Sequence, residues 1–278
     1  MWIGRQIALI LAAGFTAALL ISYAPGTGVD AQELNFHRDS SSIESIRESK
    51  QAERSALHNF GTVLRDIAHG SLGTSSAFNV SVSELLHSRA ALSVREISVG
   101  TTVAWLIAGL LILIERFFNV ATFAWRGTSS LLLLVPTAAL AALIGPVREI
   151  APYVCVLAIV LGKVYPVASD LLRRSASQRH TEFARANGLS DARVFRFAML
   201  PQAAPELLGL LGVSVNIAIG AAIAAEAVCD RPGIGRLAIE AALARDPQVI
   251  IVLTMLICTV TLLANAKHTA ALDAEALR

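Results

Sequence analysis

The sequence is poor in charged residues. Only 16% of its 278 residues are Asp, Glu, Lys or Arg, whereas 55% are hydrophobic and the mean hydropathy is +0.61. An ordinary soluble domain carries about 25% charged residues. The chain therefore has too little polar surface to cover a globule of its size, which argues against a cytosolic enzyme and against a disordered protein.

The net charge is also small, and cysteines are few. The formal net charge is +2, and no stripe of Lys and Arg alternates with aromatic residues, so nucleic-acid binding is not expected. The three cysteines, Cys155, Cys229 and Cys258, are too few and too scattered for a disulfide framework or a zinc site. An integral membrane protein remains, provided that the apolar residues fall in runs of the right length.

Six apolar runs meet that condition. A hydrocarbon core of about 30 Å takes roughly 17–25 helical residues, and each run is predicted to be helical because lipid offers the backbone no hydrogen-bond partner. The runs are Ile7–Tyr23, Ile97–Ile114, Ser129–Gly145, Ile150–Ala168, Leu207–Ala225 and Val249–Ala266. In the fourth, Lys163 can reach the interface with its amine, and Pro166 can kink the last turn. The predicted fold is an all-α integral membrane protein with six transmembrane helices.

The first run could instead be a signal peptide. Arg5 precedes it, and Ser22-Tyr23-Ala24 resembles a cleavage site. However, the run is longer than the roughly 7–15 residues of a signal core, and Pro25 would hinder cleavage. We therefore favour a retained helix.

The distribution of arginine and lysine predicts the topology. Most of these residues in short loops fall on one side if both termini are cytoplasmic, as the positive-inside rule requires. The predicted parts are a first transmembrane helix (residues 1–24), an extracytoplasmic segment (25–96), a transmembrane core (97–266) with a cytoplasmic loop at about 173–201, and a cytoplasmic tail (267–278).

The extracytoplasmic segment is polar and serine-rich, but part of it has helical periodicity. Its apolar residues recur at spacings of three or four, at Ile43, Ile46, Leu57, Phe60, Leu64 and Ile67. This pattern predicts a small amphipathic hairpin packed on itself rather than a ligand site.

The loop between the fourth and fifth runs predicts two short helices. Ser175–Asn187 suits a helix, Gly188 can end it in the left-handed conformation, and Ser190 can cap a second helix. Pro201 and Pro205 mark a break before the next membrane helix. Such a unit can dock into a groove of another protein, or it can be an amphipathic connector that lies on the membrane. Periodicity alone leaves both interpretations open.

The same loop resembles the EAA loop of binding-protein-dependent ABC importer permeases. Its pattern is Glu-Ala-Ala, three residues, Gly, nine residues, Ile, one residue and Leu-Pro; here Phe183 replaces the first alanine and Ala198 the isoleucine. The resemblance implies that this loop couples to a cytoplasmic ATPase. The coupling residues that it implies are Glu182, Phe183, Ala184, Gly188, Leu189, Leu200 and Pro201.

More of the chain is similar to one branch of these proteins, the dipeptide/oligopeptide/nickel permeases. The similar stretches are Pro25-Gly26, Gly70–Ser75, a short helix at Val82–Arg89, Glu226–Leu237, Ala244–Pro247 and the start of the tail at Leu272–Glu275. Because they follow one another in the order typical of the branch, the resemblance spans nearly the whole chain.

The resemblance implies a transport subunit of an ATP-driven importer in a bacterial plasma (inner) membrane. With a second permease it would form the path for peptides or similar small solutes. Its other partners would be cytoplasmic ABC ATPase subunits, an extracytoplasmic solute-binding protein and membrane lipid, with no nucleic acid. The chain is not expected to be an enzyme or to bind a metal or cofactor. ATP and Mg would be used by the partner ATPase, because the one Gly-Lys pair, Gly162-Lys163, lacks the first glycine of a P-loop.

Five residues are candidates for the translocation path or an outer gate: Asn216, Glu226, Pro232, Gly233 and Gly235. Polar residues inside a membrane are costly and often functional, although Asn216 could instead bond a neighbouring helix for roughly 0.6 kcal/mol. Pro232–Gly235 is typical of a turn or a re-entrant segment, and Glu226 more readily has a structural place near Arg231 or Arg236.

Two other classes of function remain as alternatives. An ion-coupled secondary transporter would need acidic residues inside its spans or broken helices in repeated halves, and the predicted runs contain no acid. The second is a membrane-embedded enzyme, or a membrane-anchored scaffold without transport activity. It would need a catalytic cluster at one depth of the membrane, and the sequence shows none.

Overall fold

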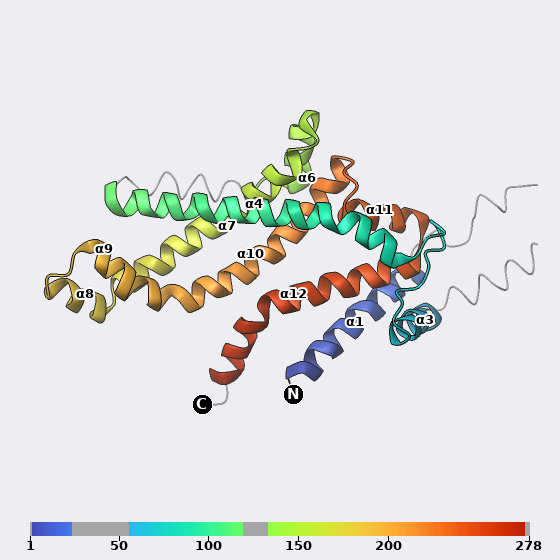
Figure 1. Ribbon diagram of the computed structural model, residues 1–278, viewed down its shortest axis with the longest axis horizontal. Helices are drawn as coiled ribbons and strands as arrows, with labels where there is room; N and C mark the ends of the chain where they lie inside the picture. Colours follow the sequence, from blue (N-terminus) through green and yellow to red (C-terminus); the bar gives the residue numbers. More distant parts are fainter. Residues whose placement is uncertain (1, 24–55, 119–132, 276–278) are drawn as a thin grey trace, which may run out of the picture. The chain divides into compact units, whose positions relative to one another are not determined.

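The computed structural model describes residues 2–23, 56–118 and 133–275 (Figure 1). All regular elements in these ranges are helical, and one isolated bridge joins Thr74 to Ser81. The elements are α1 (Trp2–Tyr23), α3 (Ala56–Ala68), α4 (Val82–Phe118), α6 (Thr137–Ile144), η1 (Gly145–Val147), α7 (Ala151–Ala176), α8 (Arg179–Ala186), α9 (Asp191–Val194), η2 (Phe195–Met199), α10 (Leu200–Val228), α11 (Ile234–Ala244) and α12 (Pro247–Glu275).

Among the residues that the structure describes, five helical stretches are long and apolar enough to cross a membrane. They are Ile3–Tyr23, Val82–Arg116, Ala151–Ala176, Asp191–Val228 and Pro247–Ala266. Each contains most or all of one of the predicted runs. The remaining run, Ser129–Gly145, begins outside the described residues, and its described part contains α6, which has only eight residues. The sixth span therefore stays a prediction.

The helix α4 is continuous over 37 residues, from Val82 to Phe118. A separate short helix was expected at Val82–Arg89, and the structure corrects this: those residues form the first turns of α4. The reason is that no proline or glycine lies between Arg89 and Ile97 to end the helix. The expected boundary between the extracytoplasmic segment and the transmembrane core, at residues 96 and 97, falls inside this helix.

Contacts divide the chain into two units. One comprises Met1–Arg89 and Leu237–Leu262, and the other comprises Ala90–Arg236 and Leu263–Arg278. Both are built from helices, and each has its own packing.

In the first unit, α3 packs against α1. The rings of Phe15 and Phe60 meet edge to face with centroids 5.6 Å apart. The apolar periodicity predicted the helix correctly, but the buried residues include Asn59 and Val63, while Leu57 is 71% exposed. The periodicity of α3 predicts which of its faces is apolar, but the position of α1 determines which of its residues are buried. The first half of the expected hairpin lies outside the described residues.

A buried carboxylate in the same unit ties the loop after α3 to the start of α12. Asp246 is fully buried and accepts hydrogen bonds from the Ser75 hydroxyl, from the Ala77 N–H at 3.1 Å and from the Val249 N–H at 3.2 Å. The last bond caps α12, whose first residue, Pro247, has no N–H to satisfy. The motifs around Ser75 and around Asp246 therefore form a single site.

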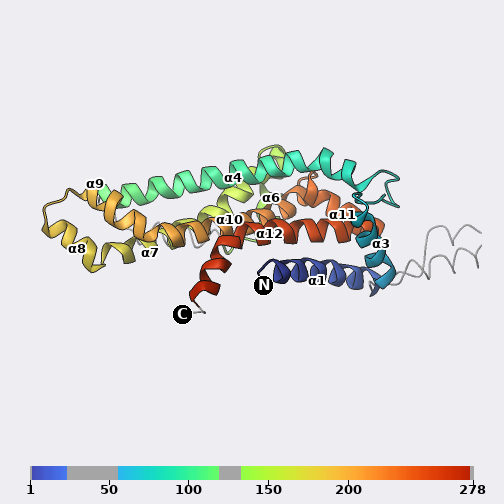
Figure 2. The same ribbon diagram turned by 60° about the horizontal axis from the view of Figure 1, so that its bottom comes forward.

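The second unit contains α4, α7 and α10 (Figures 1 and 2). These helices share a core that consists mainly of small and β-branched side chains. A Cβ on Gly100 would lie 2.7 Å from Val156, and one on Gly212 would lie 2.5 Å from the Ala264 carbonyl oxygen. Small residues let helices approach closely in a membrane, where lipid provides no hydrophobic drive for association. Gly212 and the buried alanines of α10 (Ala218, Ala221 and Ala222) serve this packing.

Candidate functional site

The connector between α7 and α10 has a defined geometry, in which α8 ends at Gly188. This glycine has φ of +78°, and its N–H donates to the Arg185 carbonyl at 2.9 Å. The Leu189 N–H reaches back to the Ala184 carbonyl at 3.3 Å. This pair of bonds is the Schellman motif, which requires a left-handed residue at its turn. Gly188 is thus confirmed as the residue that ends the first helix of the loop.

Two buried hydroxyls anchor α8 to its neighbours. The Thr181 hydroxyl donates to the Ser175 carbonyl at 2.8 Å, and the Ser175 hydroxyl donates to the Met199 carbonyl at 2.9 Å. Ser175 lies at the end of α7 and Met199 just before α10, so these bonds join both long helices to α8. These bonds fix α8 to the end of α7 and to the segment just before α10.

The predicted coupling residues lie mostly on the surface. Phe183 is 69% exposed, and Glu182, Gly188 and Leu189 are exposed as well, while Ala184 is half-buried. The structure places these five on or beside α8. The remaining two, Leu200 and Pro201, are exposed at the start of α10, beyond η2.

Charged side chains join this connector to α4. The Arg116 guanidinium donates to Asp191 at 2.8 Å, and the Arg185 Nε lies 4.0 Å from the same oxygen. Ser190 is the N-cap residue of α9, as the sequence indicated, but its hydroxyl makes no capping bond. The negative charge of Asp191 in the first turn interacts favourably with the helix dipole. The same carboxylate forms the ion pair with Arg116 of α4.

The segment η2 is a π-helical turn, and the chain has no break at Pro201 or Pro205, where one was expected; Pro205 lies inside α10. The Leu200 N–H donates to the Phe195 carbonyl, five residues back. Proline in a helix removes one bond and clashes with the carbonyl four residues earlier, here that of Phe197. Widening the preceding turn relieves this clash, so the helix continues into α10 instead of ending.

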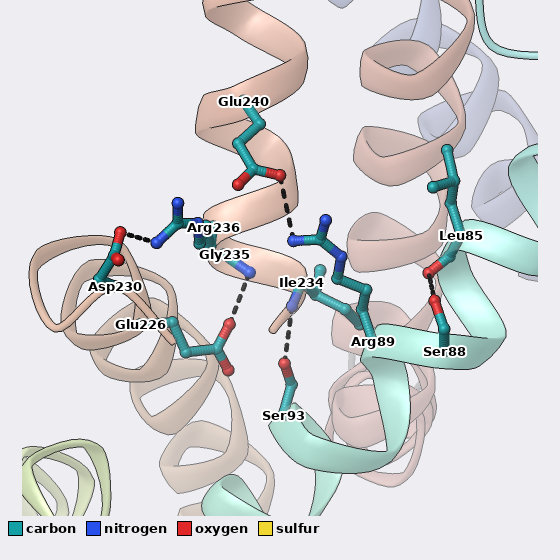
Figure 3. A network of polar contacts seen from close by, with 10 residues as sticks. All are labelled: Leu85, Ser88, Arg89, Ser93, Glu226, Asp230, Ile234, Gly235, Arg236 and Glu240. Carbon is teal, nitrogen blue, oxygen red and sulfur yellow. Dashed lines mark hydrogen bonds and ion pairs between the residues drawn. The ribbon is translucent and has the colours of Figure 1, made fainter. Parts of the chain in front are cut away.

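A second group of candidates forms the turn between α10 and α11. Glu226 is fully buried, and its Oε2 accepts a hydrogen bond from the Gly235 N–H at 2.7 Å (Figure 3). A Cβ on Gly233 would lie 2.1 Å from that oxygen. Asp230 takes a φ of +61°, which turns the chain after α10. Glycine at 233 therefore makes room for the carboxylate, and the segment is a turn that leads directly into α11. Pro232 lies exposed in this turn.

Two residues of α4 that were not candidates complete this site. The Ser93 hydroxyl accepts the Ile234 N–H at 2.8 Å (Figure 3). Glu96 is fully buried, and both the Nε and the Nη2 of Arg231 lie 3.3 Å from its Oε1. Glu96 and Glu226 each lie one residue outside a predicted apolar run, which is why the runs contained no acid.

The arginines near Glu226 have other acids as ion partners. Arg236 pairs with Asp230 (Figure 3), whereas Arg231 pairs with Glu96. Glu226 was expected to have a structural place near these arginines. Its side chain binds a backbone N–H of the turn, because the chain bends back over the end of α10.

Asn216 lies in the middle of α10 and is half-buried, with no hydrogen-bond partner for its Oδ1. Close to it in sequence, the Ser214 hydroxyl accepts the Trp105 indole N–H at 3.0 Å. Among the described residues, no group of three or more His, Cys, Asp or Glu side chains could hold a metal ion. The structure does not bring Asn216 together with the turn residues in any hydrogen bond.

The fold and these sites define a multi-pass membrane protein of packed helices with a structured connector. Residues 100–268 match the family described as binding-protein-dependent transport system inner membrane component. Because the match covers more than half of the chain, the chain belongs to this family, the membrane permease component of ABC importers. No curated protein sequence matches the chain. The connector and the α10–α11 turn lie inside the matched region, whereas Ser93 and Glu96 precede it.

Proposed function

We propose that this permease imports peptides or similar small solutes, as a member of the dipeptide/oligopeptide/nickel branch. It pairs with a second permease and receives its cargo from an extracytoplasmic solute-binding protein. The chain binds no cofactor, and ATP and Mg are used by the partner ATPase subunits. Both termini are cytoplasmic. The branch is supported by the stretches from Pro25-Gly26 to the α10–α11 turn, and the two adjoining motifs at Ser75 and Asp246 form one site.

The coupling role of the connector rests on one observation. One side of α8 is exposed, and its buried side is hydrogen-bonded to the end of α7, which is bonded in turn to the segment before α10. Thr181 and Ser175 fix its buried side, and Phe183 and Glu182 project from the other. A short helix with an exposed aromatic residue suits a groove on another protein. Because its anchors are the ends of α7 and α10, movement of a bound ATPase is transmitted to two membrane helices. A partner shifts a conformational equilibrium only if it contacts the two states differently.

A charge reversal at Glu182 tests this proposal. The permease, its ATPase, the second permease and the binding protein would be reconstituted in liposomes, with ATP-driven uptake measured for a panel of di- and oligopeptides. We expect Glu182→Lys to remove most of the uptake and to weaken co-purification of the ATPase while insertion is unchanged. Gly188→Val should do the same, because a β-branched residue does not tolerate φ of +78°.

Glu84→Lys is the matched control, since Glu84 is exposed on the first turn of α4. It should retain uptake. Normal uptake by Glu182→Lys would refute the coupling role. If no peptide were transported but the ATPase still co-purified with the wild type and not with Glu182→Lys, only the proposed substrate class would be refuted.

An ion-coupled transporter is the weaker candidate. It needs acids available within the membrane, and the two buried acids next to the α10–α11 turn, Glu96 of α4 and Glu226 of α10, are engaged by Arg231 and by the Gly235 N–H. Their contacts hold a turn in place. Uptake that persists without ATP but requires an ion gradient would favour this candidate.

A further inference from the structure

The last turns of α4 carry an acidic residue that is hydrogen-bonded to α7. One carboxylate oxygen of Glu115 accepts a hydrogen bond from the Tyr165 hydroxyl, and the other accepts one from the Ser169 hydroxyl at 3.2 Å. Both donors belong to α7, and both are buried. Each oxygen of the carboxylate therefore has its own hydroxyl donor, and these bonds fix this end of α4 to α7.

The next residue, Arg116, reaches the connector. Its Nη2 lies 2.8 Å from the Asp191 Oδ1 in the first turn of α9, and the Arg185 Nε of α8 lies 4.0 Å from the same oxygen. The Arg116 side chain is only 29% exposed, and its Nε is buried without a hydrogen-bond partner in the described part of the chain. Because a partly buried charge is costly unless it is paired, the ion pair with Asp191 is what keeps Arg116 in this position.

The contacts of α4 with the α10–α11 turn lie about one membrane thickness away. There the Ser93 hydroxyl accepts the Ile234 N–H at 2.8 Å (Figure 3), and Glu96 binds Arg231 at 3.3 Å. From Glu96 to Arg116 a helix rises about 30 Å, which is about the thickness of a hydrocarbon core. Because α4 is continuous over this length, it joins the connector at one end to the turn at the other.

We propose that Glu115 and Arg116 are positioning residues that couple α4 to the connector, so that α4 carries the movement of the connector across the membrane to the α10–α11 turn. This inference rests on the coupling role proposed above for the connector. Glu115 keeps the end of α4 against α7, and Arg116 keeps it against α9. The ATPase therefore acts on α4 as well as on the two helices that the connector joins.

The reconstituted complex provides the test, with Arg116→Gln and Asp191→Asn as separate variants. Each should lower ATP-driven peptide uptake about fivefold, the low end of typical allosteric coupling, because the Asp191 side chain is 70% exposed and water screens the pair. The ATPase should still co-purify and hydrolyse ATP, so that more ATP is used per peptide.

Two variants separate this role from a general loss of structure or charge. Arg116→Lys keeps the positive charge and should retain uptake. Arg193→Gln is the matched control, since it removes one positive charge from an exposed residue on the same helix as Asp191. It should also retain uptake with the wild-type use of ATP per peptide.

A second measurement does not depend on the solute. Spin labels on Leu113→Cys in α4 and Ala186→Cys in α8, both exposed positions, report the distance between α4 and the connector in a Cys258→Ser background. In the complex with the ATPase, this distance should be the same with and without ATP. In Arg116→Gln it should change when ATP binds, because the connector then moves without α4.

Either of two results would overturn the inference. One is wild-type uptake and ATP use in both Arg116→Gln and Asp191→Asn, while Glu182→Lys still removes uptake; the connector would then keep its coupling role without α4. The other is a label distance that changes with ATP in the wild type. Normal uptake by Glu182→Lys would instead refute the coupling role itself, and this inference with it.

Discussion

Replacing Gly235 with alanine tests how closely α11 approaches α10. A Cβ at this position would lie 2.5 Å from the Cα of Ile223 and 2.6 Å from its carbonyl oxygen. Both atoms belong to the backbone of a long helix, which cannot move aside as a flexible side chain can. Overpacking of this kind costs typically about 1–3 kcal/mol, and the backbone contact puts Gly235→Ala near 3 kcal/mol.

This magnitude predicts a measurable change in Tm. For a chain of 150–250 residues, each kcal/mol lowers Tm by about 2–4 °C, so Gly235→Ala should lower it by about 6–12 °C. The matched control is Gly220→Ala in α10, because nothing lies within 4 Å of the added Cβ there. Alanine is the better helix former by about 0.8–1 kcal/mol, so this variant should be neutral or slightly stabilising. Equal Tm values for Gly235→Ala and the wild type would refute the close approach of the two helices.

Two further predictions concern other parts of the chain. Asp246→Ala leaves three donors without their buried acceptor, and hydrogen bonds to a charged group are worth about 1.5–3 kcal/mol each. We therefore expect the free energy of unfolding, measured by thermal unfolding, to fall by about 3 kcal/mol or more. A change below about 1 kcal/mol would contradict the role of Asp246 in tying the loop after α3 to α12. Maleimide should label one thiol per native chain, that of the half-buried Cys258, because Cys155 and Cys229 are buried. All three should react after denaturation, and labelling of Cys229 in the native protein would count against the packing of the turn.

The membrane helices were predictable because lipid requires long apolar helices and the sequence contains them. Gly188 was equally predictable, since a glycine after an amphipathic stretch is the usual way to end a helix. Pro201 was misleading: it suggested a break, whereas a π turn accommodates it. A proline in the local sequence shows that the regular α-helical hydrogen bonding is interrupted. It does not show whether the helix ends there or continues through a π turn.

The partnership of Glu96 with Arg231 could not have been predicted. The two residues are 135 positions apart, and Glu96 stood at the end of an apolar run, where an acid is ordinarily solvated. Its burial depends on the fold of the turn after α10, which in turn depends on Gly233 leaving room for Glu226. Contacts of this kind arise from tertiary packing and leave no periodic signal.

The π turn at Phe195–Met199 changes how the faces of the following helix must be assigned. Its hydrogen bond joins residues five positions apart, whereas an α-helical bond joins residues four positions apart. The turn therefore contains one residue more than an α-helical turn. A helical wheel drawn in steps of about 100° from Asp191 to Val228 therefore loses phase at Phe195. The connector and α10 need separate wheels, and side chains that a single wheel would put on one stripe point in different directions.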